Sequence, residues 1–438
     1  MKKIISTLLY LFVFLLPFQT RWIYAPAFLN GGYFEYGTFS LYATEILLGI
    51  IVILSIIFFI TKLRQPVNQL TSKPVNRLLL LVLLVLLVLL NCFLAINKDL
   101  AFFKLTWLIL AVALFCVILT VKPDFKKLSW ALILSGLLQS FFAIQQFIEQ
   151  KIIANKWLGL AGQDPQTLGT PVVEAGTRWL RTFGTLPHPN MLAGFLLVGL
   201  FFIIKLYSIT ENKNQKRYLK MIFTVNFLAM LTALSRAAIL IFALITILLL
   251  IFSMKDKIQR NVALYFAGLA LFIFVLFCVA YPNLISSRVL SDSRVENISN
   301  TTRIEQYQEF WKIYKNNWIM GVGLGNYPRA LSQLNPNQPA YAYQPIHNTY
   351  LLIIAELGVM GILLIGLFVY WLAHRSVCEG GLIGLFIKNL NNKSFARLAC
   401  LTCLACLAFF DHFLWSFYFG IMLLSVVCAL TILQLRNQ

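Results

Sequence analysis

The chain has 438 residues, of which 60% are hydrophobic and only 12% are charged. Its mean hydropathy is +0.79 and its formal net charge is +20. A bilayer-spanning helix needs about 20 apolar residues, and runs of that length exclude a water-soluble globular protein. No basic stretch is both long and soluble, so the positive charge does not indicate a nucleic-acid partner.

The apolar runs predict about twelve transmembrane helices, and the expected fold is therefore an all-α, polytopic membrane helix bundle. The first run follows two lysines but lacks a small-x-small cleavage site, so we expect an uncleaved span rather than a removed signal. The expected spans are 4–17, 40–61, 78–96, 101–121, 128–148, 190–208, 220–235, 237–253, 261–281, 347–373, 397–414 and 415–435.

The basic residues predict the orientation, because Lys and Arg in short loops are retained in the cytoplasm. With residue 1 inside, most of the 36 basic residues fall in short cytoplasmic segments. We therefore expect both termini in the cytoplasm. Two long polar segments, 149–189 and 282–346, would then lie outside, and long loops on a rigid scaffold tend to carry function.

The second long segment has two recognisable patterns. Residues 301–317 predict an amphipathic helix, and the capping-box spacing of Thr302 and Glu305 predicts that this helix begins at Arg303. Its aromatic face could lie on the membrane surface or cover the bundle, and it consists of Ile304, Tyr307, Trp311 and Tyr314. GVGLGNY, residues 321–327, predicts a tight turn, because a nucleotide-binding glycine loop needs a strand before it.

The eight cysteines do not predict a disulfide framework, since none falls in an expected outside loop. CLTCLAC, residues 400–406, has metal-like spacing, but it lies in an apolar run with no charged ligand beside it. We expect these small residues to pack a helix face, and we expect no metal site.

Three polar residues border apolar runs near the expected outside face. Arg236, in LTALSRAAILIF, interrupts two short runs, and a charge near membrane depth is costly and suggests a function; the alternative is a snorkelling arginine at an exposed turn. Arg181, in RTFGTLPHPN, either binds a ligand or sits at a helix entrance as an interfacial arginine. His188, between two prolines, is either a turn residue or a catalyst.

His347 opens the run HNTYLLIIAELGVMG at the expected outer water boundary, where an unperturbed pKa near 6.5 permits proton transfer. Glu356 lies about 13 Å further along a helix that rises 1.5 Å per residue, so the two side chains should not touch. We expect Glu356 to be a neutral or paired structural group. An interfacial histidine without a role remains the alternative for His347.

These residues together suggest a phosphate ligand. Arg181, Arg236 and Arg303 are expected on the same face as His347, and the planar fork of arginine makes bidentate, charge-assisted contacts with phosphate. Bacteria present a diphosphate outside the cell as a polyprenyl-diphosphate-linked sugar. Cutting its sugar–phosphate bond would require charge stabilisation and a base that activates an acceptor hydroxyl.

Three segments resemble the motifs of the O-antigen ligase and O-antigen polymerase superfamily. They are SRAAIL (235–240), Arg303 ahead of WKIYKNNWIMGVGLGNY, and HNTYLLIIAELGVMG after the long loop. The resemblance covers roughly residues 180–370, and the rest of the chain resembles the family only as hydrophobic spans. Alanine follows the SR motif where glycine is common in the family.

The resemblance implies a GT-C-like fold with a large extracytoplasmic loop in the bacterial cytoplasmic (inner) membrane. It implies that Arg236 and Arg303 hold the diphosphate of an undecaprenyl-diphosphate-linked glycan, with Arg181 as a weaker candidate. His347 would act on the acceptor hydroxyl in an inverting, metal-independent transfer without a cofactor. The secondary site candidates are Asn348, Glu356 and His188.

The resemblance also suggests how the chain is divided. We expect a transmembrane scaffold at 1–180, a catalytic region at 181–373 that includes the loop 282–346, and C-terminal transmembrane helices at 374–438. The motifs are shared by ligases, polymerases and protein O-oligosaccharyltransferases, so the acceptor, a glycolipid, a growing glycan or a protein, stays open. A lipid-linked glycan flippase is the non-enzymatic alternative, although it would carry ionisable residues at mid-membrane depth on several helices.

Overall fold

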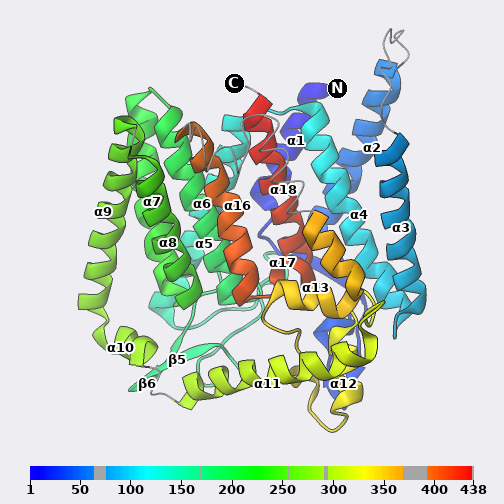
Figure 1. Ribbon diagram of the computed structural model, residues 1–438. Coiled ribbons are helices and arrows are strands. Elements are labelled where there is room, and N and C mark those ends of the chain that lie inside the picture. Colours follow the sequence, from blue (N-terminus) through cyan, green and yellow to red (C-terminus); the bar gives the residue numbers. More distant parts are fainter. Residues whose placement is uncertain (64–74, 168, 255, 291–293, 368–391, 437–438) are drawn as a thin grey trace.

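The computed structural model describes the chain except residues 64–74, 168, 255, 291–293, 368–391 and 437–438 (Figure 1). Long helices run side by side through the body of the molecule, and both termini lie at one end of it. The opposite end carries three helices and a hairpin that lie across the bundle: α10 (Pro282–Leu290), α11 (Arg294–Asn317), α12 (Tyr327–Leu334) and β5–β6 (Val172–Ala175, Thr177–Leu180).

The protein is an α-helical membrane protein. Among the described residues, five helices are long and apolar enough to cross a bilayer: α2 (Ala43–Leu63), α4 (Lys98–Val121), α5 (Phe125–Glu149), α6 (Pro189–Ile209) and α9 (Lys257–Ala280). Four shorter apolar stretches accompany them, at Val85–Leu94, Arg236–Phe252, Ala399–Phe410 and Tyr418–Leu433. The expected number of about twelve spans stays a prediction. The other long helices are α1 (Lys2–Leu15), α3 (Val75–Leu94), α7 (Lys213–Thr232), α8 (Arg236–Phe252), α16 (Asn392–Phe410) and α18 (Tyr418–Arg436).

Helix α6 forms the centre of the bundle. Nearly every residue from Pro189 to Leu206 is buried, and α5, α7, α8, α9 and α16 surround the helix. A helix that is apolar on all sides is expected in such a position, since no face of it tolerates water. Cys400 and Cys403 are buried in the main apolar core, where α16 contacts α6 and α8, so the small residues of CLTCLAC pack a helix face as predicted.

Small antiparallel hairpins interrupt the helical fold at the loop end, and the hydrophobic pattern did not predict them. Between α1 and α2, β1 (Arg21–Ala25) pairs with β4 (Phe39–Tyr42), and β2 (Phe28–Leu29) pairs with β3 (Gly32–Tyr33). We call residues 20–42 the N-terminal hairpin unit. The β5–β6 hairpin precedes α6.

The predicted amphipathic helix exists, but its expected beginning is wrong. Helix α11 starts at Arg294, so Thr302 lies inside the helix and does not cap it. The buried face holds Gln306, Phe310 and Ile313. The predicted aromatic face is largely exposed and does not cover the bundle, with Ile304, Tyr307 and Trp311 open and Tyr314 half-buried.

The long run expected at 347–373 is interrupted in the structure. Helix α13 (Thr349–Leu357) ends at Gly358, whose φ is +62°, and helical residues resume at 359. Residues 318–323 dock at the break: the backbone amides of Val322 and Gly323 donate to the carbonyls of Ala355 and Glu356. The predicted tight turn is confirmed, because all three glycines of GVGLGNY have positive φ, between 69° and 97°.

Candidate active site

Three of the four histidines of the chain come together at the loop end of the bundle. His188, His347 and His412 line a cavity of about 350 Å³ with Asp411. The rings of His347 and His412 lie 5.2 Å apart between centroids. Each histidine directly precedes a helix or its cap: His188 precedes α6, His347 precedes Asn348 and α13, and His412 precedes α17 (Phe413–Ser416). The fourth histidine, His374, lies outside the described residues.

The tautomer of His347 follows from its contacts with Gln306 on α11. The backbone amide of His347 lies 3.2 Å from Oε1 of Gln306, and the same oxygen lies 3.0 Å from Nδ1 of the ring. A backbone N–H can only donate, which identifies this Gln306 atom as the acceptor oxygen. Nδ1 therefore carries the proton, and Nε2 keeps its lone pair, as a general base requires.

The other two histidines are held in complementary forms. Nδ1 of His188 accepts the backbone amide of Asn190 at 3.2 Å, so Nε2 carries the proton and is a donor. Nδ1 of His412 lies 2.6 Å from Oγ of Ser416, whose hydroxyl donates to the carbonyl of His412. The His412 ring must then donate through Nδ1, which leaves Nε2 as a second acceptor.

Asp411 supplies the negative charge of the cluster. Its Oδ1 accepts the amides of His412 at 2.8 Å and Phe413 at 3.2 Å, and its Oδ2 accepts the side-chain amide of Asn190 at 2.9 Å. Burial alone would raise the pKa of Asp411, but the three imidazoles and the Asn190 amide outweigh burial and lower it. Asp411 is therefore an anion at neutral pH.

Burial keeps the histidines neutral. It lowers the pKa of His412 to about 4, and it also lowers the pKa of His188 and His347 below the ordinary value of 6.5. Asp411 opposes the shift at each ring, and Arg303 adds to it at His347. At neutral pH the cluster thus has three neutral imidazoles beside one carboxylate. An imidazole in it can accept a proton, and the carboxylate stabilises the resulting imidazolium.

The segment RTFGTLPHPN is positioned by glutamines of α5. Oε1 of Gln146 accepts the amides of Phe183 and Gly184, and Oε1 of Gln139 accepts the amide of Thr185. Gly184 has φ +59°, and a Cβ there would come within 2.5 Å of Gln139. The buried glutamines and this glycine therefore fix the approach to His188.

Two of the three predicted diphosphate-binding arginines lie at the turn between α7 and α8. Arg236 is the first residue of α8. Nε of Arg181 donates to the carbonyl of Ala233 at 3.0 Å, and its guanidinium also donates to Oδ1 of Asn190 at 2.7 Å. Arg288 on α10, which the motifs did not indicate, donates to the carbonyl of Leu234. Positive groups beside the last carbonyls of α7 also stabilise the end of that helix.

Arg303 lies apart from that turn, on α11. It is half-buried, close enough to His347 to lower the pKa of that ring, and it lies one helical turn before Gln306. None of Arg181, Arg236 and Arg303 lines the histidine cavity itself. The structure therefore brings His347 and His188 together, and it leaves the arginines outside the cavity wall.

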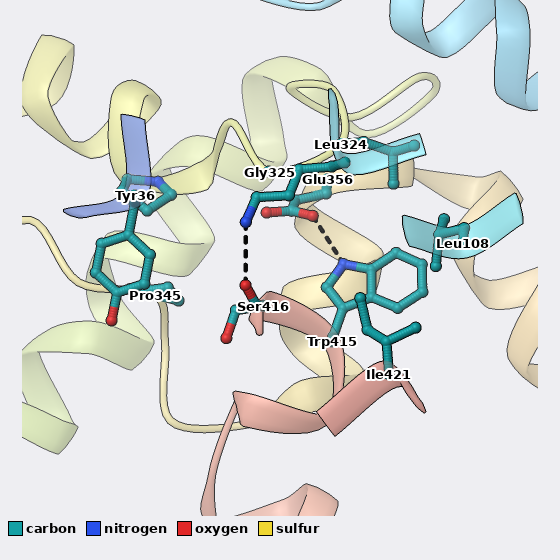
Figure 2. A pocket seen from close by; sticks show the side chains of 11 residues that line it. Tyr36, Leu108, Leu324, Gly325, Pro345, Glu356, Trp415, Ser416 and Ile421 are labelled. Atoms are coloured by element: carbon teal, nitrogen blue, oxygen red, sulfur yellow. Dashed lines mark hydrogen bonds between the residues drawn. The ribbon is translucent and has the colours of Figure 1, made fainter. Parts of the chain in front are cut away.

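The remaining candidates have structural contacts. The side chain of Asn348 accepts the amide of Leu351 at 3.1 Å and so caps α13. Glu356 lines a second, much smaller pocket, of about 20 Å³, where Oε2 accepts Nε1 of Trp415 at 2.8 Å (Figure 2). As predicted, Glu356 is a paired group, and it does not line the cavity of His347.

Sequence reasoning missed Asp411 and His412. Both fall within the expected span 397–414, but α16 ends at Phe410 and the pair lies in the connection to α17. A charged pair inside an apolar run is itself a signal of function.

Among the described residues, no group of three or more His, Cys, Asp or Glu side chains is arranged to hold a metal ion.

Residues 221–366 match the family model described as O-antigen ligase. The matched segment contains Arg236, Arg303 and His347, whereas Asp411, His412 and the N-terminal hairpin unit lie outside it. No curated protein matches the chain. Over about a third of its length, the chain is therefore similar to the O-antigen ligase family.

Proposed function

We propose that the protein is a glycosyltransferase of the bacterial cytoplasmic membrane. It transfers a glycan from an undecaprenyl-diphosphate donor to an acceptor hydroxyl at the extracytoplasmic surface. The observation that carries this proposal is the tautomer of His347. Gln306 holds the proton on Nδ1, so Nε2 keeps its lone pair, and the anionic Asp411 lines the same cavity. The helices that begin beside the cavity, α6 and α13, have their first residues toward the end of the bundle opposite to both termini (Figure 1).

The reaction needs one proton acceptor and one stabilised leaving group. Nε2 of His347 takes the proton of the acceptor hydroxyl, whose oxygen forms the new bond to the anomeric carbon from the side opposite the diphosphate. The bond between that carbon and the phosphate oxygen breaks, and its electron pair leaves on the diphosphate. The anomeric configuration is inverted. Asp411 stabilises the imidazolium through its charge.

The leaving diphosphate is the proposed ligand of the arginines. The charge of Arg303 acts on His347, and Arg181 and Arg236 would approach from the α7–α8 turn. Guanidinium groups match the oxygens of a diphosphate in bidentate fashion, and they would stabilise the charge that develops as the bond breaks. This arrangement requires no metal ion.

The test is transfer by the purified full-length protein. Donor consumption and a new glycosidic product are measured with the lipid-linked glycan and envelope glycolipids of the source bacterium. We expect His347→Ala to insert and melt normally while transfer falls by about 10²–10⁴. Gln333→Ala, an exposed change on α12, is the control. Wild-type transfer by His347→Ala would exclude this base.

Two further arms of the same assay separate the alternatives. Excess EDTA should leave transfer unchanged, and loss of transfer that a divalent cation restores would contradict metal independence. A flippase would move the lipid-linked glycan across a liposome membrane intact, without donor consumption. A ligase, a polymerase and a protein O-oligosaccharyltransferase differ in the molecule that carries the new bond, which the product identifies.

A further inference from the structure

The N-terminal hairpin unit forms a wall of the cavity that the family match does not include. Arg21, Glu35, Tyr36 and Tyr42 line the same cavity as His347. All four lie far outside residues 221–366. The roles proposed for the matched segment, a diphosphate site and a base, leave this wall without a function.

The hairpin unit is attached to the segment that leads into His347. Nδ2 of Asn30 donates to the carbonyls of Pro336 and Gln338, both at 2.7 Å. Gly32 lies so close to Ala340 that a Cβ there would come within 3.1 Å of the alanine methyl. Phe34 is buried in a cluster that includes Ile346. The wall therefore has a defined position relative to the base.

The polar part of this wall is the ion pair between Arg21 and Glu35, which Tyr33 supports with a hydrogen bond. The guanidinium of Arg21 makes two bonds to Glu35, at 2.6 and 2.9 Å, and the hydroxyl of Tyr33 donates to the same carboxylate at 3.1 Å. The side chains of Arg21 and Glu35 remain 23% and 35% exposed. They therefore present oriented donors and acceptors to the cavity, with little side-chain freedom left to lose on binding.

The charge of the lining decides which ligands suit it. Arg21 and Glu35 cancel, the three histidines are neutral at pH 7, and Asp411 leaves a net charge of −1. Such a lining disfavours a phosphate or a carboxylated sugar, and it offers hydrogen bonds to neutral hydroxyls. A volume of about 350 Å³ is at the small end of the usual range for ligand sites, which is about 300–1,000 Å³.

An aromatic corner joins this wall to the histidines. The Tyr36 ring lies 6.1 Å from the His412 ring and 6.0 Å from the Phe417 ring, in both cases near edge-on. A flat apolar body beside oriented polar groups suits a sugar, which has an apolar ring face and hydroxyls around its edge. Tyr36 contacts His412, whose ring lies against that of His347, so this corner borders both imidazoles.

We propose that the N-terminal hairpin unit forms the acceptor subsite, and that this subsite takes the terminal unit of a neutral, hydroxyl-rich glycan held by Arg21, Glu35 and Tyr36. This inference rests on the proposed transfer function, and it selects a sugar hydroxyl over a peptide serine or threonine. It also separates the two substrates: the acceptor binds in the cavity, and the diphosphate binds at the arginines outside it.

The test measures binding by the purified full-length chain with four probes. They are maltotriose as a neutral glycan, trigalacturonate as its anionic counterpart, the tripeptide Gly-Ser-Gly, and undecaprenyl diphosphate. Saturation-transfer NMR should detect maltotriose and not the anionic or peptide probe. Losing a hydrogen bond to a charged group corresponds to roughly a tenfold change, so Glu35→Gln should weaken maltotriose binding about tenfold. Undecaprenyl diphosphate binding should not change.

Two further variants keep the result interpretable. Tyr36→Leu removes the ring without touching the ion pair, and it should also weaken maltotriose binding if the subsite is correct. Glu305→Gln makes the same charge change on the exposed side of α11 and should have no effect. Unchanged maltotriose binding in both hairpin variants, or preferred binding of trigalacturonate or Gly-Ser-Gly, overturns the subsite. Failure of the wild type to bind undecaprenyl diphosphate would instead contradict the proposed donor.

Discussion

At the residue scale, the tautomer of the proposed base, His347, is fixed by a partner on another element. Gln306 on α11 contacts both the backbone and the ring of His347, so it fixes which nitrogen carries the proton. In the proposed mechanism Gln306 touches neither reacting atom, so its role is that of a positioning residue. It was not indicated by any motif, because glutamine is common on the surface of an amphipathic helix and only its burial separates it from its neighbours.

The pH dependence of transfer tests this arrangement. His347 acts as a base only when neutral, and its pKa is lowered by burial and by Arg303 and raised by Asp411, with a net decrease. Transfer should therefore be retained at pH 6.5 and fall only as the pH drops further. Gln306→Glu places a carboxylate beside Nδ1 and raises the pKa of His347. The acid limb of the pH–rate profile should therefore move upward by about one pH unit or more.

Two companion variants complete that measurement. Gln306→Leu removes the acceptor and frees the tautomer, and kcat should fall about tenfold or more. Gln308→Glu, an exposed change on the same helix, should leave the profile in place. An acid limb that does not move in Gln306→Glu would show that His347 is not the titrating base.

Arg303 allows charge and geometry to be separated. Lysine keeps the positive charge but loses the bidentate fork, so Arg303→Lys should lose much of the transfer rate and bind undecaprenyl diphosphate more weakly. Its melting temperature should stay the same, because Arg303 lies on a helix whose buried face is formed by other residues. Arg294→Lys, at the exposed start of α11, is the matched control. Equal donor affinity in Arg303→Lys would place the diphosphate elsewhere.

At the element scale, the loop end is built from short segments that dock on helix ends. The docking of residues 318–323 on the break after α13 is an example, since it satisfies carbonyls that the interruption at Gly358 leaves open. The Trp318 and Ile319 carbonyls in turn accept the amide of Val359. The break therefore belongs to the fold and connects the loop to the helix that follows His347.

Gly321 shows how closely this segment fits. Its φ is +71°, and a Cβ would come within 2.3 Å of the backbone of Glu356. Gly321→Ala should lower the free energy of unfolding by about 1–3 kcal/mol, as measured by thermal melting in detergent. Gly268→Ala on α9 has no atom within 4 Å of the added methyl and should leave stability unchanged or slightly raised. Equal melting of the two variants would contradict the docking.

The elements differ in how far the sequence predicted them. Long apolar runs identify helices such as α4 and α9, because their length exceeds that of any alternative element. The sequence did not predict the hairpins, because strands of two to five residues give an alternating pattern too short to be distinguished from a loop. The expected start of α11 at Arg303 is wrong because Thr302 and Glu305 have the spacing of a cap, whereas the helix begins nine residues earlier, at Arg294.

At the scale of the whole molecule, the site joins all three segments expected from the sequence. The cavity lining includes Arg21 from 1–180, His188 and His347 from 181–373, and His412 from 374–438. The division itself stays a prediction. The motifs pointed to His347 because its own neighbours carry the pattern, but they could not point to Arg21 or His412, which reach the cavity only through the packing of the bundle.

The orientation of the molecule can be measured directly. The positive-inside pattern predicts that the end with both termini faces the cytoplasm and that the α10–α12 end faces outward. In intact cells, a membrane-impermeant maleimide should label Gln333→Cys on α12 and not Asn214→Cys at the start of α7, both exposed positions. The parent chain gives the background, and permeabilised cells should label both. The reverse pattern in intact cells would invert the topology.

The distribution of the cavity along the chain has a consequence for biosynthesis. The Asn30 contacts to Pro336 and Gln338 join positions more than 300 residues apart, and Asp411 and His412 are made later still. A nascent chain therefore inserts most of its apolar helices before any complete cavity can exist. The proposed activity therefore requires α16 to be packed beside α6, and a ribosome-bound or prematurely terminated chain that lacks α16 would occupy the membrane without consuming donor.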